Sequence, residues 1–424
     1  MNIKLRLIIM GFFQFFVWGA WLITIGSFWF QYKGWDNTDF GIIFSTMGLA
    51  SLFMPALMGI LADRRINAEK LYGILHIGGA LCLFALPSAS NPKTFFWIMF
   101  LNMIFYMPTL ALAITVSYTA LKKKGLDVVK SYPPIRVWGT AGFIVAEWAV
   151  SLLGFETSPN QFYLAGAASL FLGLYAFSLP KCPPPSRGES TGTFVSQMGL
   201  QAFTLFKQRK MAVFFLFAML LGAALQLTNA YGTTFLRDFA LDPQYKDSFV
   251  VNYSAIIISL SQVSELLFIL AIPFFLKRFG IKYVMVMSMV AWILRFGLFA
   301  YGDPGTNFWM IIVSCIVYGM AFDFFNISGS LFVENETTPG IRASAQGLFM
   351  MMTNGVGAVI GSSLSGWLID RFFLDANGKQ MWYDIWITFA GYALVVTLLF
   401  LVMFKYKHYP NDPPRHVEPL LPTE

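Results

Sequence analysis

Five charged side chains interrupt long apolar stretches of this sequence: Arg136, Glu147, Glu265, Arg295 and Asp323. In a hydrocarbon environment an Arg or Asp costs roughly 2.5–3.5 kcal/mol, so such a residue normally faces a cavity or a partner. A carboxyl group in that setting can take up and release a proton, and a guanidinium can bind an anion or a carboxylate. These residues are therefore the first candidates for a functional site.

A polar stripe follows one face of the helix expected over 135–154. Arg136, Thr140, Phe143 and Glu147 are separated by four, three and four residues, which places them on one helical face. A face that combines a cation, a hydroxyl, an aromatic ring and an acid does not suit contact with lipid. The alternative is that Arg136 lies at the edge of the bilayer and extends toward the lipid headgroups.

Two further helices carry paired polar side chains. Gln226 and Asn229 are three residues apart, and Gln262 and Glu265 have the same spacing, so each pair shares a helical face. Amides both donate and accept hydrogen bonds, as the recognition of an uncharged polar solute requires. Alternatively, these side chains hydrogen-bond between helices and hold a bundle together.

Aromatic side chains accompany the last of the five charges. Tyr318 and Phe322 are four residues apart and share a face, whereas Asp323 is turned by about 100° from Phe322. Rings on a cavity wall suit a flat heteroaromatic ligand, since base stacking on an aromatic side chain contributes roughly 1–3 kcal/mol in other proteins. In a chain with 45 phenylalanines, Phe143 and Phe322 could equally be packing residues. Asp323 could also pair with Arg136.

The composition indicates what kind of chain positions these residues. Of the 424 residues, 57% are hydrophobic and only 12% are charged, and the mean hydropathy is +0.63. At about 20 apolar residues per membrane crossing, the chain holds roughly a dozen spans and no large catalytic domain outside the membrane. The net charge of +7 suits basic loops on the inner side of a membrane rather than nucleic-acid binding.

Signatures of catalysis and of metal binding are missing from the sequence. It contains neither a phosphate-binding Walker loop nor a His-Glu-x-x-His zinc motif. Its three cysteines, Cys82, Cys182 and Cys315, are too far apart for a zinc site or a disulfide framework. We therefore expect neither an enzyme nor a metal centre.

We expect an all-α integral membrane protein of twelve transmembrane helices in two six-helix pseudo-repeats. Most of the 29 Lys and Arg residues fall in alternate connectors on one side and in the tail, which predicts that both termini are cytoplasmic. The expected spans are 6–30, 39–62, 70–88, 94–120, 135–154, 162–180, 211–237, 248–277, 281–301, 307–333, 342–371 and 382–405.

The two halves of the chain resemble each other across a Pro- and Ser-rich linker. Three short motifs recur in the same order about 200 residues later, as in transporters whose parallel repeats enclose a substrate site near the membrane midplane. The matches are Phe12-Phe13-x-Phe15 with Phe214-Phe215-x-Phe217, Phe96-Trp97 with Phe308-Trp309, and Ile135-Arg136 with Ile341-Arg342. The expected organisation is an N-terminal half over 1–180, a cytoplasmic linker over 181–210, a C-terminal half over 211–405 and a cytoplasmic tail over 406–424.

The connector over residues 59–65 reads GILADRR. It resembles the Gly-x-Leu-Ala-Asp-Arg loop motif of the major facilitator superfamily. This similarity makes Asp63 and Arg64 the expected gating-loop residues, although an exposed turn would explain them too.

Five longer stretches of the sequence are distinctive: PPIRVWGTAGFI (133–144), LGAALQLTN (221–229), SQVSELLFILAIPFF (261–275), YGMAFDFFNISGS (318–330) and IRASAQG (341–347). They closely resemble the nucleoside:proton symporter family of the same superfamily, the branch of nucleoside and xanthosine permeases. The similarity covers nearly the whole chain.

This resemblance implies proton-coupled uptake of purine and pyrimidine nucleosides through a bacterial cytoplasmic (inner) membrane by alternating access. The expected partners are a nucleoside, protons and the lipid bilayer, and no nucleic acid. We expect no cofactor, with the proton gradient as the energy source. We also expect a monomer. Carried over by motif, the substrate site comprises Arg136, Thr140, Phe143, Gln226, Asn229, Gln262, Glu265, Tyr318, Phe322 and Asp323.

The carboxylates are the expected carriers of the coupled proton. Glu265 and Asp323 are the main candidates, because either acid could load a proton on one side and release it on the other. Glu147 is a third candidate. It departs from the pattern of the family, which has an apolar residue such as methionine at this position. Glu147 could neutralise Arg136, add a titratable site or alter substrate choice; it could also merely face a neighbouring helix.

Two other functions stay open on the residues alone. A proton-linked sugar permease of the same fold also uses carboxylates, arginine and aromatic platforms. A membrane receptor could bind a nucleoside without moving it, although the chain has no evident output domain. An integral-membrane enzyme fits the sequence least well.

Overall fold

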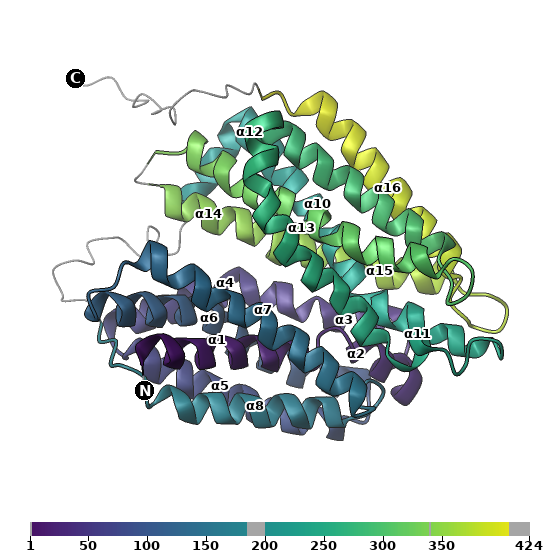
Figure 1. Ribbon diagram of the computed structural model, residues 1–424, viewed down its shortest axis with the longest axis horizontal. Helices are drawn as coiled ribbons and strands as arrows, with labels where there is room; N and C mark the ends of the chain where they lie inside the picture. Colours follow the sequence, from purple (N-terminus) through teal and green to yellow (C-terminus); the bar gives the residue numbers. More distant parts are fainter. Residues whose placement is uncertain (1, 185–199, 339–340, 407–424) are drawn as a thin grey trace. The chain divides into compact units, whose positions relative to one another are not determined.

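Helices account for nearly all of the described chain (Figure 1). The computed structural model describes residues 2–184, 200–338 and 341–406. The α-helices are α1 (Ile3–Gly19), α2 (Ile25–Ser27), α3 (Asn37–Phe44), α4 (Thr46–Arg64), α5 (Ala68–Ala85), α6 (Pro92–Lys123), α7 (Val128–Leu152), α8 (Asn160–Ala176), α10 (Arg209–Asp238), α11 (Phe249–Asn252), α12 (Ser254–Tyr301), α13 (Phe308–Glu336), α14 (Arg342–Met350), α15 (Ala358–Phe372) and α16 (Trp382–Met403). Between them lie the 3₁₀ segments η2 (Leu86–Ser88), η3 (Leu200–Lys207) and η4 (Phe239–Leu241) and the π-helical segments η1 (Phe28–Lys33) and η5 (Met351–Gly357).

Each expected span coincides with helical structure, but some of these helices are interrupted. The first span, expected over 6–30, is α1 up to Gly19, followed after a turn by α2 and η1. The spans expected over 248–277 and 281–301 lie in α11 and α12. A kink at Gly280 separates the two parts of α12; its φ of 80° and ψ of 169° are accessible to glycine without strain.

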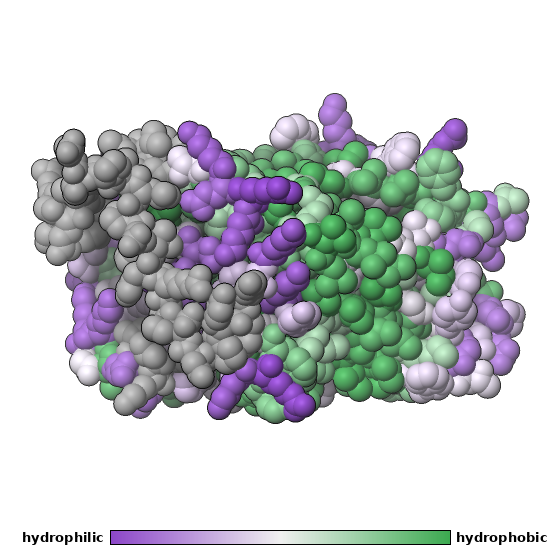
Figure 2. Space-filling model, turned by 90° about the horizontal axis from the view of Figure 1, so that it is seen from above, coloured by the Kyte–Doolittle hydropathy of each residue, from purple (hydrophilic) through white to green (hydrophobic). Residues whose placement is uncertain are grey.

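Eight helical segments among the described residues are long and apolar enough to cross a membrane. Large apolar side chains such as Leu270 (80% exposed) and Val402 (73% exposed) lie on the surface. On the face shown in Figure 2, hydrophobic residues gather in a broad band with hydrophilic residues on either side. Such a surface fits lipid rather than water, so the chain is a multi-pass membrane protein. The count of twelve spans and the two-repeat plan stay predictions.

The chain divides into two compact units that cut across the two sequence halves. The described residues of unit 1 are 2–184, 226–259 and 358–380, and those of unit 2 are 200–225, 260–338, 341–357 and 381–406. Unit 1 therefore contains α1 to α8, part of α10, α11, the start of α12, and α15.

Unit 1 depends on a close contact between the backbones of α1 and α7. A Cβ atom added at Gly19 would lie 2.5 Å from the carbonyl oxygen of Phe143, and one added at Gly142 would clash with the carbonyl oxygen of Phe12. Glycine at both positions lets the two helices touch, as small residues commonly do between membrane helices.

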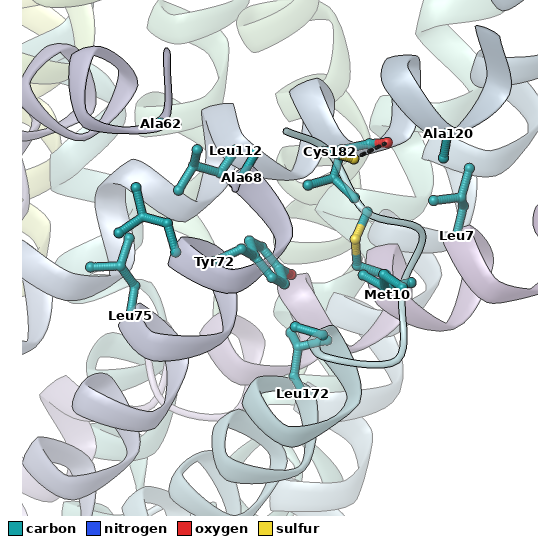
Figure 3. Packing of buried hydrophobic residues seen from close by; sticks show 14 of the residues in the cluster. Leu7, Met10, Ala62, Ala68, Tyr72, Leu75, Leu112, Ala120, Leu172 and Cys182 are labelled. Carbon is teal, nitrogen blue, oxygen red and sulfur yellow. Dashed lines mark hydrogen bonds between the residues drawn. The ribbon is translucent and has the colours of Figure 1, made fainter. Parts of the chain in front are cut away.

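A cluster of buried apolar side chains fills the space between α1, α5, α6 and α8 (Figure 3). Leu7, Tyr72, Leu112 and Leu172 come from these four helices and are at most 3% exposed. Cys182, which follows α8, belongs to the same cluster, and burial raises the pKa of its thiol to about 11. The thiol therefore acts as a packing group rather than a reactive one.

Other contacts of unit 1 join helices from the two halves of the sequence. Gly26 of α2 lies against α10, where an added Cβ would be 2.7 Å from the carbonyl oxygen of Ala230. The carboxylate of Asp370, in α15, accepts hydrogen bonds from the backbone N–H groups of Asn37 (3.1 Å) and Thr38 (2.5 Å). An anion at this end of α3 is also stabilised by the helix dipole.

In unit 2, α12 and α13 carry half of the expected substrate-site residues and pack tightly. Ser264 Oγ donates a hydrogen bond to the carbonyl oxygen of Ile316. Gly319 permits this approach, because an added Cβ would lie 2.6 Å from the carbonyl carbon of Ser264. Helix α16 packs on the second part of α12, where the rings of Trp386 and Phe299 are 5.2 Å apart.

Replacing Gly142 by alanine is expected to lower the thermal stability of the purified protein. The new methyl group meets the backbone of Phe12 and forces α1 and α7 apart, at a cost of about 1–3 kcal/mol. Gly391 in α16 is the matched control, because a Cβ there would meet nothing within 4 Å. Gly391→Ala should leave the unfolding temperature in detergent unchanged or slightly raised; equal temperatures for the two variants would contradict the close contact.

Candidate functional site

The polar stripe of α7 lies in unit 1, and burial increases along it. Arg136 is exposed, and its guanidinium carbon lies 4.3 Å from the ring centre of Phe15. Thr140 and Phe143 are half-buried, and Glu147 is 0% exposed. The stripe therefore runs from an accessible cation to a fully enclosed acid.

Glu147 is an acid without a described hydrogen-bond partner. Among the described residues, neither of its carboxylate oxygens accepts or donates a hydrogen bond. The charged group that acts on it is Glu156, of the same sign. An isolated ion in such a place is expensive, so Glu147 keeps its place among the candidates for carrying a proton.

The amide pair of α10 also lies in unit 1. Gln226 is 2% exposed, and its Oε1 has no hydrogen-bond partner within the described ranges. Asn229 is half-buried. One turn further, Thr233 donates a 2.6 Å hydrogen bond to the carbonyl oxygen of Ile23. Because buried polar atoms are normally paired, Gln226 Oε1 is suited to accept a hydrogen bond from a ligand or a water molecule.

In unit 2, Tyr318 and Phe322 form an aromatic platform on α13. Their ring centres are 5.9 Å apart and their planes differ by 7°, which confirms that they share a face. Trp292 of α12 meets Tyr318 edge-on, with 5.9 Å between ring centres. The guanidinium carbon of Arg295, also in α12, lies 4.6 Å from the centre of the Tyr318 ring.

Two of the expected acids come together in unit 2. Asp323 and Glu265 interact electrostatically. Asp323 is 4% exposed, and its Oδ2 has no hydrogen-bond partner in the part of the chain that the structure describes, whereas Glu265 is half-buried. Gln262, on the same helix as Glu265, is 8% exposed. A buried acid beside a second acid is a candidate for binding a proton.

The sequence prediction missed two amides beside the aromatic platform. A cavity of about 20 Å³ is lined by residues that include Phe322, Trp292, Asn326 of α13 and Asn354 of η5. This space is about the size of one water molecule. The π-helical form of η5 is frequent at functional sites.

A second missed set is a buried polar network inside unit 1. Gln14 Oε1 accepts a hydrogen bond from the Tyr72 hydroxyl (2.6 Å) and lies 3.0 Å from His76 Nε2. The Tyr106 hydroxyl donates to the carbonyl oxygen of Gln14 (2.7 Å), and its ring lies 5.6 Å from that of Trp18. The network joins α1, α5 and α6, and α1 in turn supports α7. The sequence signal that could have indicated this network is the presence of polar residues within apolar runs.

A third missed set centres on Glu156, in the connector after α7. Its carboxylate is 2% exposed and accepts hydrogen bonds from Arg237 Nη1 (3.1 Å), Ser254 Oγ (2.5 Å) and the N–H of Ala255 (3.2 Å). Ser151 Oγ donates to it as well (2.5 Å). One carboxylate thus links α7 to α10 and α12. Glu156 and Arg237 lie in or beside predicted loops, and no sequence pattern indicates that they form an ion pair.

The expected gating loop is described only in part. The side chain of Asp63 lies outside the described residues, and Arg64 is exposed. For metals, the described residues contain no group of three or more His, Cys, Asp or Glu side chains that could hold an ion.

A family profile described as nucleoside H+ symporter matches residues 1–409 of the chain. The chain belongs to this family. The xanthosine permease of Escherichia coli (strain K12) is 54% identical over 412 residues, which cover 97% of this chain and 98% of the permease. A crystal structure of the nucleoside transporter NupG, as a D323A mutant, matches with a TM-score of 0.92 and 49% identity over 95% of this chain and 100% of that chain.

A more distant structure shows the breadth of the fold. A crystal structure of the peptide transporter POT, in a mutant form, matches with a TM-score of 0.70 at 14% identity and covers 94% of this chain and 93% of its own. As a member of the nucleoside H+ symporter family, the protein is a proton-coupled nucleoside transporter and not an enzyme. The sequence predictions of family, function and non-enzymatic class are confirmed.

In this nucleoside H+ symporter, the buried Glu156–Arg237 pair is expected to contribute more to stability than an exposed pair. Glu156→Gln removes the charge that compensates Arg237, at a cost of about 3 kcal/mol. The control is Arg342–Glu334, 2.7 Å apart with side chains 33% and 43% exposed, for which about 0–1 kcal/mol is expected.

Unfolding temperatures of the single and double variants give a coupling for each of the two pairs. A clearly larger coupling for Glu156 and Arg237 is the expected result. Equal couplings would show that the buried pair is not an important contact.

Proposed function

We propose that the protein takes up purine and pyrimidine nucleosides with protons through a bacterial cytoplasmic membrane, as a monomer. The observation that supports this most is the Tyr318–Phe322 stack beside the interacting acids Asp323 and Glu265. A planar base stacks well on such rings whatever its identity, since every base has a π-face. The names of the relatives, a xanthosine permease and a nucleoside transporter, agree with this substrate class.

Each group of the proposed site has chemistry that matches one part of a nucleoside. The base lies against Phe143 and Phe322, and amide and hydroxyl groups meet its polar edge and the ribose hydroxyls. The complete proposed site is Arg136, Thr140, Phe143, Gln226, Asn229, Gln262, Glu265, Tyr318, Phe322 and Asp323.

The coupled proton is proposed to bind at Glu265 and Asp323. Because the two acids interact and Asp323 is almost fully buried, the pair is suited to bind a proton and to release it when solvent access changes sides. Glu147, buried and without a described partner, is a third proton-binding candidate. Asp63 and Arg64 are proposed to belong to the gating loop.

Uptake into proteoliposomes tests the function directly. A panel of purine and pyrimidine nucleosides is offered with and without an acid-outside pH gradient, and accumulation above the outside concentration only with the gradient is expected. Competition by ribose or a disaccharide, with no effect of nucleosides, would instead indicate a sugar permease. Binding without counterflow would indicate a receptor.

Glu265→Gln should abolish accumulation driven by the pH gradient, because the amide cannot carry the proton, while exchange of nucleoside across the membrane persists. The matched control is Glu334→Gln in α13, an acid that lies 2.7 Å from Arg342 and is 43% exposed; it should retain both activities. Unimpaired gradient-driven uptake by Glu265→Gln would remove the proposed proton role.

The architecture proposed for this transporter is twelve transmembrane helices in two repeats with cytoplasmic termini. The repeated Phe-Trp motif supports it, because Trp97 and Trp309 both lie in the first turns of a helix and are 59% and 55% exposed. The proposed segments are the halves 1–180 and 211–405, the linker 181–210 and the tail 406–424. The orientation is tested by labelling the variant Gln244→Cys with a membrane-impermeant thiol reagent. Labelling by reagent added outside is expected. Labelling only by reagent added inside would show that the orientation is the reverse of the proposed one.

A further inference from the structure

Arg295 is a fully buried cation to which neither the sequence nor the proposed transport cycle assigns a role. It lies in the second part of α12 and is 0% exposed. Burying a guanidinium is expensive in a membrane protein, so its retention calls for a use. It contacts oxygen atoms and aromatic rings of unit 2.

The oxygen contacts join Arg295 to the two helices, α12 and α13, that carry the unit 2 residues of the proposed site. Its Nη1 donates hydrogen bonds to the carbonyl oxygen of Ser314 (2.8 Å) and to Ser261 Oγ (3.3 Å). Ser314 Oγ in turn donates to the carbonyl oxygen of Arg295 (2.9 Å). Ser314 is one helical turn before Tyr318, and Ser261 is one turn before Glu265.

The ring contacts place the guanidinium directly on the aromatic platform. Its carbon lies 4.6 Å from the ring centre of Tyr318 and 4.8 Å from that of Phe299. Tyr318 is also stacked on Phe322 and met edge-on by Trp292, three residues before Arg295 on the same helix. Attraction between a cation and a ring face is strongest where water is excluded, so these contacts together define the position of the Tyr318 ring.

We propose that Arg295 is a positioning residue for nucleoside binding, which holds the Tyr318 ring, and through it the Tyr318–Phe322 platform, in the orientation on which the base stacks. The inference rests on the proposed function, because it acts through a proposed substrate residue. An apolar side chain of similar length would fill the same space without burying a charge. Lysine would keep the charge but lacks the planar group that lies against a ring while donating two hydrogen bonds.

The test compares nucleoside transport by the full-length protein and its variants in proteoliposomes at one fixed pH gradient. Arg295→Met is expected to raise the KM for a nucleoside about tenfold, with a change in maximal rate below about threefold, because the contact is lost in binding. Arg295→Lys should give a smaller increase in KM. Phe299→Leu is the control, since it removes the other ring contact of Arg295 and Phe299 is not itself a proposed site residue; its KM should stay within about twofold of the wild type.

A double-mutant cycle separates positioning from general packing. If Arg295 acts through Tyr318, adding Arg295→Met to Tyr318→Leu should raise KM little further than Tyr318→Leu alone. Three results would each overturn the proposal. The KM of Arg295→Met could be unchanged, or the KM increases of Arg295→Met and Tyr318→Leu could multiply in the double variant. The third such result is a KM increase in Phe299→Leu equal to that in Arg295→Met. If Arg295→Met does not fold, the same cycle is measured with Arg295→Lys. An unchanged KM in Tyr318→Leu would instead refute the proposed substrate site.

Discussion

The cost of burying charge within a membrane protein is the constraint on which this structure depends. Each ionisable side chain inside the bundle has to gain bonds or give up its charge. Arg295 gains oxygen atoms and ring faces, and Glu156 gains a cation and several N–H and O–H donors. Glu147 and Asp323 differ, since both retain carboxylate oxygens without a hydrogen-bond partner among the described residues. Acids of that kind have room for a proton, as a proton-coupled transporter requires.

Close contacts between helix backbones fix the positions of the helices that carry these buried ionisable side chains. Helix α7 touches α1 at Gly142, and α13 touches α12 at Gly319. The candidate residues therefore stand on helices whose positions are set by direct backbone contact. A site supported in this way is more defined than one built on loops. The π-helical segment η5 adds Asn354 to the cavity beside the aromatic platform, where a regular helix would present its side chains differently.

Local patterns predicted part of this molecule, and tertiary contacts decided the rest. Apolar runs predicted the helical segments, and four-residue spacing predicted that Tyr318 and Phe322 share a face, because both signals lie within one element. The family followed from long motif matches. The partners of Arg295 and the Glu156–Arg237 pair could not be predicted, since the residues involved are 19 to 81 positions apart and meet only after folding.

The most direct test of the account is the movement of protons that accompanies nucleoside entry. Proteoliposomes carry a trapped pH-sensitive dye, start without a pH gradient, and receive labelled nucleoside from outside. The account predicts that the lumen acidifies as nucleoside enters, in proportion to the nucleoside taken up, and that ribose alone causes no change. Nucleoside entry without acidification would contradict the claim that the buried acids couple transport to protons.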